Sequence, residues 1–362
     1  MPDVSADPPA AAPAVHASSL AAYTTLRLGG PAGVLTVATE TDEAVEILRQ
    51  VAREGEPVLV LAGGSNVVIG DEGFPGTVLL LRTRGVEVID RDRRGALVRV
   101  AAGEPWDEFV ADTLARGLSG LEALSGIPGS AGATPIQNVG AYGQEVARTI
   151  EAVHVYDRAD DQIKVMSLPE CRFAYRSSVF KHNDRWVVLH VDFRLAESTE
   201  SAPVRYVELA RQLGVEVGDR AAADRVRETV LKLRASKGMV LDPEDPDTRS
   251  VGSFFTNPVL SAQEWAAVQD RLADLGEPPS WPAPNGTVKV PAAWLIEKAG
   301  FAKGYGGRDG VAISSKHTLA LTNRGGGTTA ALLDLAREIR DGVRDRFGVV
   351  LHPEPVLVGC AL

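Results

Sequence analysis

The feature that most constrains this chain is an uncharged, glycine-rich stretch at residues 123–144, which holds five glycines, two prolines and no charged side chain. Backbone N–H groups freed by glycine can turn toward a diphosphate and neutralise it by their oriented dipoles. A second turn, Gly63-Gly64-Ser65-Asn66, adds small polar side chains that can donate to phosphate. The two turns predict either a cradle for a cofactor's phosphates or a pair of tight turns packed against strands.

Neither turn has the pattern of the commonest nucleotide-binding folds. Neither is a G-x-G-x-x-G that opens a helix, and neither ends in the Gly-Lys-Ser/Thr of a P-loop. The six histidines show no HxH or HxxxH spacing, so we predict no metal site. The sequence therefore predicts neither a Rossmann domain, nor a P-loop domain, nor a metalloenzyme.

The length and charge of the chain limit its architecture and its partners. A chain of 362 residues has room for two or three domains. Its formal net charge of -10 argues against nucleic-acid and anionic-membrane partners, which need a positive surface. Its two cysteines, Cys171 and Cys360, form no CxxC pair, which fits a reducing compartment.

Targeting signals are missing from the sequence. Residues 1–19 are rich in alanine and proline and lack the basic and apolar regions of a signal peptide, so we expect a disordered tail. No run approaches the roughly 18 to 20 apolar residues of a membrane helix. We expect a cytoplasmic protein.

Hydrophobic periodicity predicts an α+β fold with a boundary in the polar connector at residues 197–202. In the first portion, strands are expected at residues 34–39, 57–61, 67–69, 78–81, 96–102, 152–156, 163–166 and 186–193, with one helix capped by Thr41 and another from Trp106 to a closing Gly117. In the second portion, helices are expected at residues 219–237, after a capping box at Ser261, at 291–300 with Pro291 in the first turn, and at 329–347, before a last strand at 349–358.

Six separated motifs occur in a telling order. They are Gly-Gly-Ser-Asn at 63–66, Ile-Pro-Gly-Ser at 127–130, Pro-Ile-Gln-Asn-Val-Gly-Ala-Tyr-Gly at 135–143, Tyr-Arg-Ser-Ser-Val-Phe-Lys at 175–181, Gly-Ser-Phe-Phe-Thr-Asn-Pro at 252–258 and Pro-Glu-Pro at 353–355. In content and order they resemble the UDP-N-acetylenolpyruvoylglucosamine reductases, the MurB family. The likeness covers nearly the whole chain after Ala21.

The resemblance implies a fold and a reaction. It implies an FAD-binding domain of the vanillyl-alcohol-oxidase (PCMH) type at residues 20–200, then an α+β substrate-binding domain at 201–362 whose last strand returns to the active site. It also implies that NADPH reduces non-covalently bound FAD. Hydride then passes to the enolpyruvyl group of UDP-N-acetylglucosamine enolpyruvate and yields UDP-N-acetylmuramate for peptidoglycan.

Three residues match the family's catalytic positions. Hydride addition to an enolpyruvyl ether builds an enolate dianion, which the guanidinium of Arg176 can grip. The hydroxyl of Ser253 would protonate the adjacent carbon, with Lys237 or water resupplying the proton. Glu354 would carry a raised pKa, because its charge would repel the substrate's carboxylate unless it is protonated or paired. Without the motifs, each residue would be given a structural role. Arg176 would pair with a buried acid, Ser253 would bond the backbone of a strand, and Glu354 would be an ordinary acid in a turn.

The resemblance also assigns ligand-binding residues. The flavin would be held by Gly63, Gly64, Ser65, Asn66, Gly129, Ser130 and Asn138, and the substrate by Tyr142, Arg234, Lys237, Asn257 and Tyr206. His317 reads as a core histidine that could lie near the substrate pocket. The family's usual lysine is Thr256 here and its acid is His352, which leaves details of the pocket charge open. We expect a monomer.

Two other functions remain open at this point. One is another flavin oxidase of the same fold, although such enzymes often tether FAD through His or Cys and the glycine-rich stretch contains neither. The other is a non-catalytic flavin sensor, which would have no need of Arg176, Ser253 and Glu354. The way the flavin is attached and its redox behaviour distinguish these readings.

Overall fold

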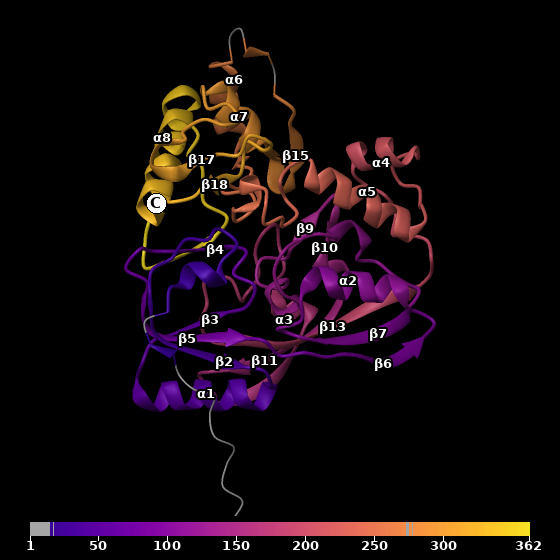
Figure 1. The fold of residues 1–362 in the computed structure, drawn as a ribbon. Helices are drawn as coiled ribbons and strands as arrows, with labels where there is room; N and C mark the ends of the chain where they lie inside the picture. The colour runs from indigo at the N-terminus through magenta and orange to yellow at the C-terminus, as the bar shows by residue number, and fades with distance from the viewer. Residues whose placement is uncertain (1–14, 17, 273–274, 277) are drawn as a thin grey trace, which may run out of the picture.

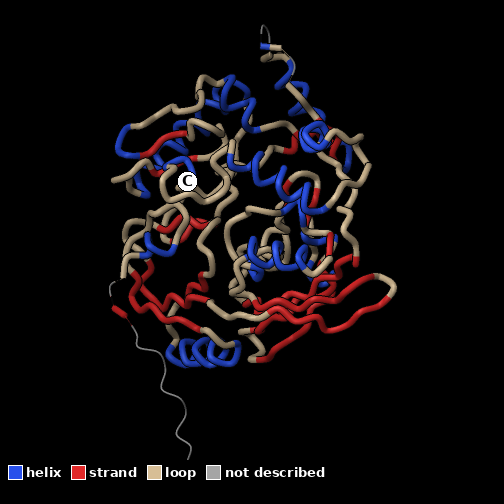
Figure 2. Tube along the Cα trace, turned by 45° about the vertical axis from the view of Figure 1, so that its right-hand side comes forward, coloured by secondary structure: helices blue, strands red, loops and turns tan. Residues whose placement is uncertain are grey.

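The computed structural model of the protein describes residues 15–16, 18–272, 275–276 and 278–362. Two larger sheets lie side by side at one end of the molecule, and most of the helices and the long loops lie beyond them (Figures 1 and 2). The first sheet has the strand order β1-β2-β5-β3, with β1 at Val15–His16, β2 at Ala32–Ala38, β5 at Phe74–Leu81 and β3 at Val58–Leu61. Strands β2, β5 and β3 run parallel, so their carboxyl ends meet at one edge.

Helix α1 (Thr41–Glu54) follows β2 and covers this sheet (Figure 1). It buries Ala44, Val45, Leu48 and Val51, which share one helical face. The helix ends at Gly55, which adopts the left-handed conformation at φ 70°. Glycine does so without strain because it has no Cβ. Thr41 was expected to cap this helix but is its first helical residue, because Glu43 reaches back to the Thr39 N–H instead.

The second sheet is antiparallel, with the order β12-β11-β13-β7-β6 and a short β8 added to β13. Its strands are β6 (Val86–Asp92), β7 (Gly95–Ala101), β8 (Leu118–Ser119), β11 (Ile150–Asp157), β12 (Gln162–Ser167) and β13 (Trp186–Glu197). Helix α2 (Trp106–Ala115) covers one face, where the rings of Trp106, Phe109 and Phe193 pack within 5.8 Å of one another. Gly117 follows the helix at φ 71°, as expected.

The glycine-rich stretch crosses from α2 toward β11. Near its end, the short strand β9 (Gly140–Ala141) pairs with β10 (Gln144–Glu145). A short helix, α3 (Leu168–Cys171), precedes the Tyr175–Lys181 motif. The stretch therefore lies against the apolar core of the antiparallel sheet, which includes Leu124, Ala131 and Val146.

Most of the regular secondary structure in the second half of the chain is helical. It contains α4 (Val207–Leu213), α5 (Ala223–Ala235), α6 (Ala262–Gln269), α7 (Ala292–Lys298) and α8 (Thr329–Phe347). Small strands join them: β14 (Val259–Leu260), β15 (Trp281–Ala283) and β16 (Thr287–Lys289) form one sheet, and β17 (Val311–Ile313) pairs with β18 (Leu321–Asn323). The capping box at Ser261 is present as expected, whereas Pro291 precedes α7 rather than lying in its first turn.

The end of the chain returns to the first half. Strand β19 (Val356–Val358) pairs in parallel with β4 (Val67–Ile69), directly after the Gly63–Asn66 turn. The strand expected at 349–358 forms only over these last three residues, because prolines at 353 and 355 cannot donate to a ladder. Before them, Glu354 N donates to Phe254 O at 2.8 Å.

Two further parts of the sequence interpretation changed. Of the expected disordered tail at residues 1–19, residues 1–14 and 17 lie outside the described residues, whereas Val15–His16 pairs with β2 and Ser19 caps a 3-10 helix at Leu20–Tyr23. Strand β6 and helix α4 were not expected. Within the described residues no helix is long and apolar enough to cross a membrane.

Candidate active site

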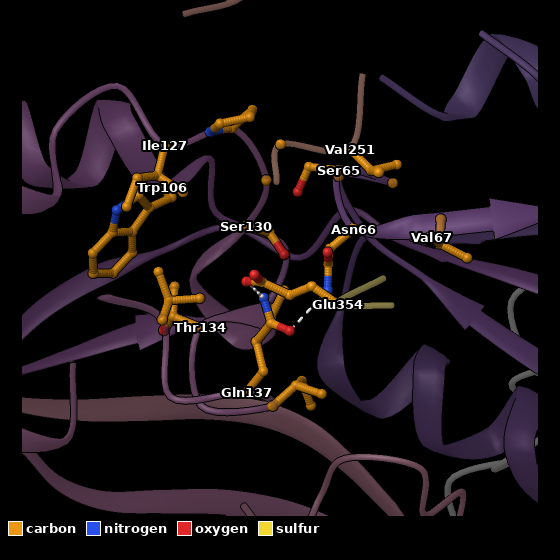
Figure 3. Close-up of a pocket in the computed structure, with 18 of the residues that line it drawn as sticks. Ser65, Asn66, Val67, Trp106, Ile127, Ser130, Thr134, Gln137, Val251 and Glu354 are labelled. Carbon is orange, nitrogen blue, oxygen red and sulfur yellow. Dashed lines mark hydrogen bonds between the residues drawn. The ribbon is translucent and has the colours of Figure 1, made fainter. Parts of the chain in front are cut away.

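A cavity of about 350 Å³ opens where the two glycine turns, the Tyr175–Lys181 motif and the end of the chain meet (Figure 3). It brings together ten of the residues singled out from the sequence: Gly63, Gly64, Ser65, Asn66, Gly129, Ser130, Arg176, Arg234, Ser253 and Glu354. These residues come from six separate segments of the chain. Among the described residues that line the cavity there is neither His nor Cys.

The two glycine turns touch each other through their backbones. A Cβ on Gly63 would lie 2.4 Å from Gly129 Cα, and one on Gly129 would lie 2.6 Å from Ser65 Oγ. Gly64 has φ 58°, and its Cβ would lie 2.0 Å from Tyr23 O. Only glycine permits this approach, which leaves backbone N–H groups at the cavity free of covering side chains.

Two buried polar atoms at the cavity have no hydrogen-bond partner among the described residues: Ser130 Oγ and Arg234 Nε. Buried donors are nearly always satisfied, so each one points to a ligand group. Arg234 also donates from Nη2 to Met239 O at 2.8 Å, and burial lowers its pKa. A hydroxyl and a guanidinium near glycine turns fit the phosphates and polar edges of nucleotide ligands.

The charged centre of the cavity is an ion pair. Arg176 Nε lies 3.1 Å from Glu354 Oε1, and Arg176 Nη2 donates to Gly140 O at 2.7 Å. Arg176 has φ 51°, a left-handed backbone that a non-glycine residue adopts only when its surroundings fix it. Its guanidinium is thereby held between the glycine-rich stretch and the end of the chain.

Gln137 connects this centre to the first glycine turn (Figure 3). Its Nε2 donates to Glu354 Oε1 at 3.3 Å, and its Oε1 accepts from Asn66 Nδ2 at 2.9 Å. Lys181 Nζ lies 3.4 Å from Gln137 Oε1 and from Glu354 O, and 3.3 Å from Arg176 O. The Gln137 amide and the Lys181 ammonium therefore connect four segments of the cavity wall.

Burial shifts the pKa values of the groups at this centre. It raises the pKa of Glu354, against the opposing charges of Arg176 and Lys181, as expected from the sequence. Burial lowers the pKa of Lys181 and of Lys289, whose ammonium lies 3.5 Å from the centroid of the Tyr175 ring. The centre thus combines a carboxyl group whose pKa is raised with several basic side chains, an environment that attracts a carboxylate ligand.

Ser253 lines the same cavity from the second half of the chain. The two residues after it, Phe254 and Phe255, are fully buried and stack edge to face at 5.1 Å. Phe254 accepts from Glu354 N and donates to Leu319 O at 2.7 Å. The serine hydroxyl is therefore carried by a rigid segment bonded directly to the Glu354 segment.

A cluster of predicted substrate residues lies outside the cavity lining. The rings of Tyr142 and Tyr206 meet edge to face at 5.5 Å, and Lys237 Nζ lies 6.0 Å from the centroid of Tyr142. Lys237 also pairs with Glu208 Oε2 at 2.9 Å. Burial is the largest single influence on Lys237 and acts to lower its pKa. The hydrogen bond to Glu208, together with the charges of Glu208, Tyr142 and Tyr206, raises the pKa overall.

Two further predicted residues hold the backbone. Asn138 is buried at φ 47°, and its side chain bonds Glu145, Ala174 O and Ala147 N, so it fixes the glycine-rich stretch rather than lining the cavity. Asn257 Oδ1 accepts from Ala292 N at 2.9 Å at the start of α7. Gln137 and Lys181 lie within the sequence motifs, but the sequence predicted no role for either of them. Lys289 was not predicted at all. A polar amide inside an uncharged stretch was the available signal for Gln137.

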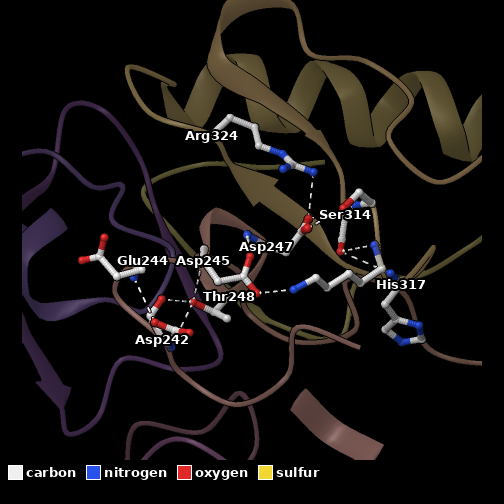
Figure 4. Close-up of polar contacts among 10 residues, drawn as sticks. Asp242, Glu244, Asp245, Asp247, Thr248, Ser314, His317 and Arg324 are labelled. Atoms are coloured by element: carbon white, nitrogen blue, oxygen red, sulfur yellow. Dashed lines mark hydrogen bonds and ion pairs between the residues drawn. The ribbon is translucent and has the colours of Figure 1, made fainter. Parts of the chain in front are cut away.

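His317 follows Ser314 on the loop drawn in Figure 4. Burial lowers its pKa to about 4, with added repulsion from Lys237 and Lys303. Among the described residues, no group of three or more His, Cys, Asp or Glu side chains is placed to hold a metal ion.

Two family models match separate parts of the chain. One, described as an FAD binding domain, matches residues 31–167, and the other, described as the C-terminal domain of UDP-N-acetylenolpyruvoylglucosamine reductase, matches residues 242–358. These matches confirm the predicted order of an FAD-binding domain and a C-terminal domain. The boundary near residue 200 lies between them and stays a prediction.

Whole-chain relatives agree with the family models. The chain is 63% identical over 345 residues to a UDP-N-acetylenolpyruvoylglucosamine reductase of Salinispora arenicola, with 95% of each chain covered, and 57% identical over 347 residues to one of Thermobifida fusca, with 95% and 97% covered. The crystal structure of the Thermus caldophilus enzyme (MurB) aligns with a TM-score of 0.64 at 26% identity over 96% of this chain and 98% of that one. The chain therefore belongs to the UDP-N-acetylenolpyruvoylglucosamine reductase family.

Proposed function

We propose that this cavity holds FAD and that the protein uses NADPH to reduce UDP-N-acetylglucosamine enolpyruvate to UDP-N-acetylmuramate, a step of peptidoglycan precursor synthesis. The observation that carries the proposal is the meeting of Arg176, Ser253 and Glu354 at one cavity walled by two glycine turns. FAD, when bound, takes up a hydride from NADPH and passes it to the substrate. Everything else in the reaction has to come from the chain.

The first task of the protein is to bind FAD without a covalent link. The backbone amides of the Gly63–Asn66 turn and of Gly129 would meet the diphosphate, and Ser130 Oγ would donate to the cofactor. Asn138 supports this wall from behind through its bonds to the glycine-rich stretch. The absence of His and Cys from the described lining fits a non-covalent flavin and gives no support to a tethered oxidase.

The second task is to stabilise the charge that develops on the substrate. Hydride addition to the terminal carbon of the enolpyruvyl group sends electrons into its carboxylate, so an enolate dianion forms. Arg176 would grip that carboxylate, and Lys181 and Lys289 would add to the positive field around it. Glu354, held by Arg176 and Gln137, would act in its protonated form as a hydrogen-bond donor.

The third task is to deliver a proton. Ser253 Oγ would donate to the carbon next to the carboxylate, because the buried Phe254 and Phe255 hold its segment in place. We propose Tyr142, Arg234, Lys237 and Tyr206 as the residues that take the UDP portion. Asn257 would donate to the substrate from its NH2 group, because its side-chain oxygen accepts a hydrogen bond from Ala292 N.

Ser253→Ala tests the division of labour. Protonation belongs only to the second half-reaction, so flavin reduction by NADPH should stay within about twofold while substrate reduction slows by about 10² or more. Stopped-flow absorbance measures each half-reaction separately. Ser65→Ala, at the same cavity but on the glycine turn, is the matched control and should leave the substrate half-reaction less affected. Equal losses in both half-reactions of Ser253→Ala would contradict its role as the proton donor.

We also propose that the protein works in the cytoplasm, where NADPH is available, and that it does so as a monomer. A sedimentation measurement with FAD bound tests the second statement. A dimer at micromolar concentration would contradict it.

A further inference from the structure

A second cavity, of about 530 Å³, lies behind the first glycine turn. It is lined by the N-terminal segment at residues 22–27, by Arg82 at the carboxyl end of β5 and by the loop at residues 241–249. It shares Gly63, Leu241 and Thr248 with the wall of the flavin cavity, but its own polar lining is different. Ligands of open α/β sheets bind outside the carboxyl ends of parallel strands, which is where this cavity opens.

Three arginines line this second cavity: Arg27, Arg82 and Arg249. None of them lines the flavin cavity, and within the described part of the chain none of them forms an ion pair. Their side-chain hydrogen bonds all go to backbone carbonyls. Arg27 Nη1 donates to Ala22 O at 3.2 Å, Arg82 Nη1 to Ala62 O and Leu81 O at 2.8 and 2.9 Å, and Arg249 Nη2 to Pro243 O at 3.3 Å.

Each guanidinium therefore keeps N–H donors for a ligand, since every one of these bonds uses a single terminal nitrogen. Arg82 is half-buried, and burial together with the nearby Arg84 lowers its pKa. A cation in such surroundings is normally paired with an anion, because its desolvation is otherwise uncompensated. The cavity has the charge of a site whose counter-ion comes from outside the chain.

The acids of the neighbouring loop do not supply that counter-ion (Figure 4). Asp245 pairs with Lys316 at 2.6 Å, and Asp247 pairs with Arg324 at 2.8 Å and accepts from Ser315. Asp242 is the one carboxylate in the described lining of the cavity, and its Oδ1 accepts from Glu244 N at 3.0 Å. The described lining of the cavity thus holds three arginines and a single carboxylate.

The backbone also fixes one of the three arginines toward this place. Arg27 has φ 56°, a conformation that costs free energy for any residue with a Cβ. It is held there by its own N–H, which donates to Thr24 O, and by Asn323 Nδ2, which donates to Leu26 O and Arg27 O at 3.2 Å. A strained residue that carries a cation into a cavity is typical of a binding site.

We propose that this second cavity is an anion site that takes a phosphate or diphosphate group, separate from the flavin and substrate sites. Guanidinium groups match both phosphate and carboxylate, but an excess of two positive charges favours a di- or polyanion over a monocarboxylate. The group comes either as a free inorganic anion or as part of a nucleotide. The site does not depend on the proposed substrate.

Calorimetric titration of the FAD-loaded full-length protein at low ionic strength tests this, with inorganic pyrophosphate and ADP as separate probes. We expect one pyrophosphate site per chain. Arg27→Gln/Arg249→Gln should weaken it at least about tenfold, because each charge-assisted bond lost is equivalent to roughly that factor. Stronger binding of ADP than of pyrophosphate identifies the group as nucleotide-borne, and the reverse identifies a free anion.

Two controls isolate the site. Arg93→Gln/Arg346→Gln removes the same charge from exposed positions and should leave binding unchanged. Lys237→Gln, in the proposed substrate pocket, should also leave this binding event in place. If the double variant is unstable, Arg249→Gln alone provides the test, because its side chain bonds only Pro243 O within the described residues.

Three results overturn the proposal. The first is that neither probe binds the FAD-loaded protein. The second is that Arg27→Gln/Arg249→Gln binds as tightly as the unmodified protein. The third is that this variant loses its FAD, which would assign the cavity to the cofactor.

Discussion

Replacing Gly63 by alanine should lower the affinity for FAD by forcing the two glycine turns apart. A Cβ on Gly63 lies 2.4 Å from Gly129 Cα, and carbon atoms in contact lie about 3.5–4.0 Å apart, so the turns must separate by roughly 1 Å. Hydrogen bonds of about 2.9 Å do not survive such a shift. If two bonds to the diphosphate are lost at about 1.5–3 kcal/mol each, the affinity falls by about 10² to 10⁴.

The measurement is the FAD content after gel filtration, followed by titration of FAD into the apoprotein. Gly342→Ala in α8 is the matched control, because its Cβ would lie 2.5 Å from Phe301 Cε2 and neither residue lines the cavity. Overpacking should cost that variant about 1–3 kcal/mol of unfolding free energy without loss of FAD affinity. If Gly63→Ala keeps its FAD and is merely destabilised like Gly342→Ala, the contact between the turns does not shape the cofactor site.

Two other predictions concern charged groups near the substrate pocket. Glu208→Gln frees Lys237 from its carboxylate partner, so the KM for the UDP substrate should fall by about two- to fivefold, the worth of a partly exposed pair. Glu228→Gln, on the exposed face of α5, is the control and should leave KM unchanged. An unchanged KM in Glu208→Gln would show that Lys237 does not contact the substrate. His317 has a folded pKa of about 4, below the unfolded value of about 6.5, so its contribution to stability is complete above pH 6.5 and is lost as the pH falls toward 4. That loss is at most about 3 kcal/mol. The free energy of unfolding, measured in urea at pH 7.0 and 4.5, should change less with pH in His317→Asn than in the unmodified protein. An equal change in the two proteins would contradict the role of His317.

The sequence predicted those parts of the fold that depend on local patterns. Helix α1 follows from its apolar spacing and from Gly55, and the glycine turns follow from residues that permit close approach of the backbone. Strand β6 escaped notice because its residues are mostly exposed and charged, so it lacks the apolar run of the buried strands. Prolines shortened the last strand to Val356–Val358.

The candidate site could be predicted only through the resemblance of its motifs. Arg176, Ser253 and Glu354 lie in segments separated by at least 70 residues, and no local pattern states that they meet. The bonds of Gln137 to Asn66 and Glu354 exist only once three segments have come together. The same holds for the cavity behind the flavin turn, whose arginines come from three unrelated stretches.

The measurement that tests the central claim most directly is a two-step anaerobic titration of the purified protein. NADPH should bleach the flavin absorbance near about 450 nm, and UDP-N-acetylglucosamine enolpyruvate added afterwards should restore it with formation of one equivalent of UDP-N-acetylmuramate. Bleaching without recovery would contradict the assigned substrate. No bleaching at all in the FAD-loaded protein would contradict the reductase itself.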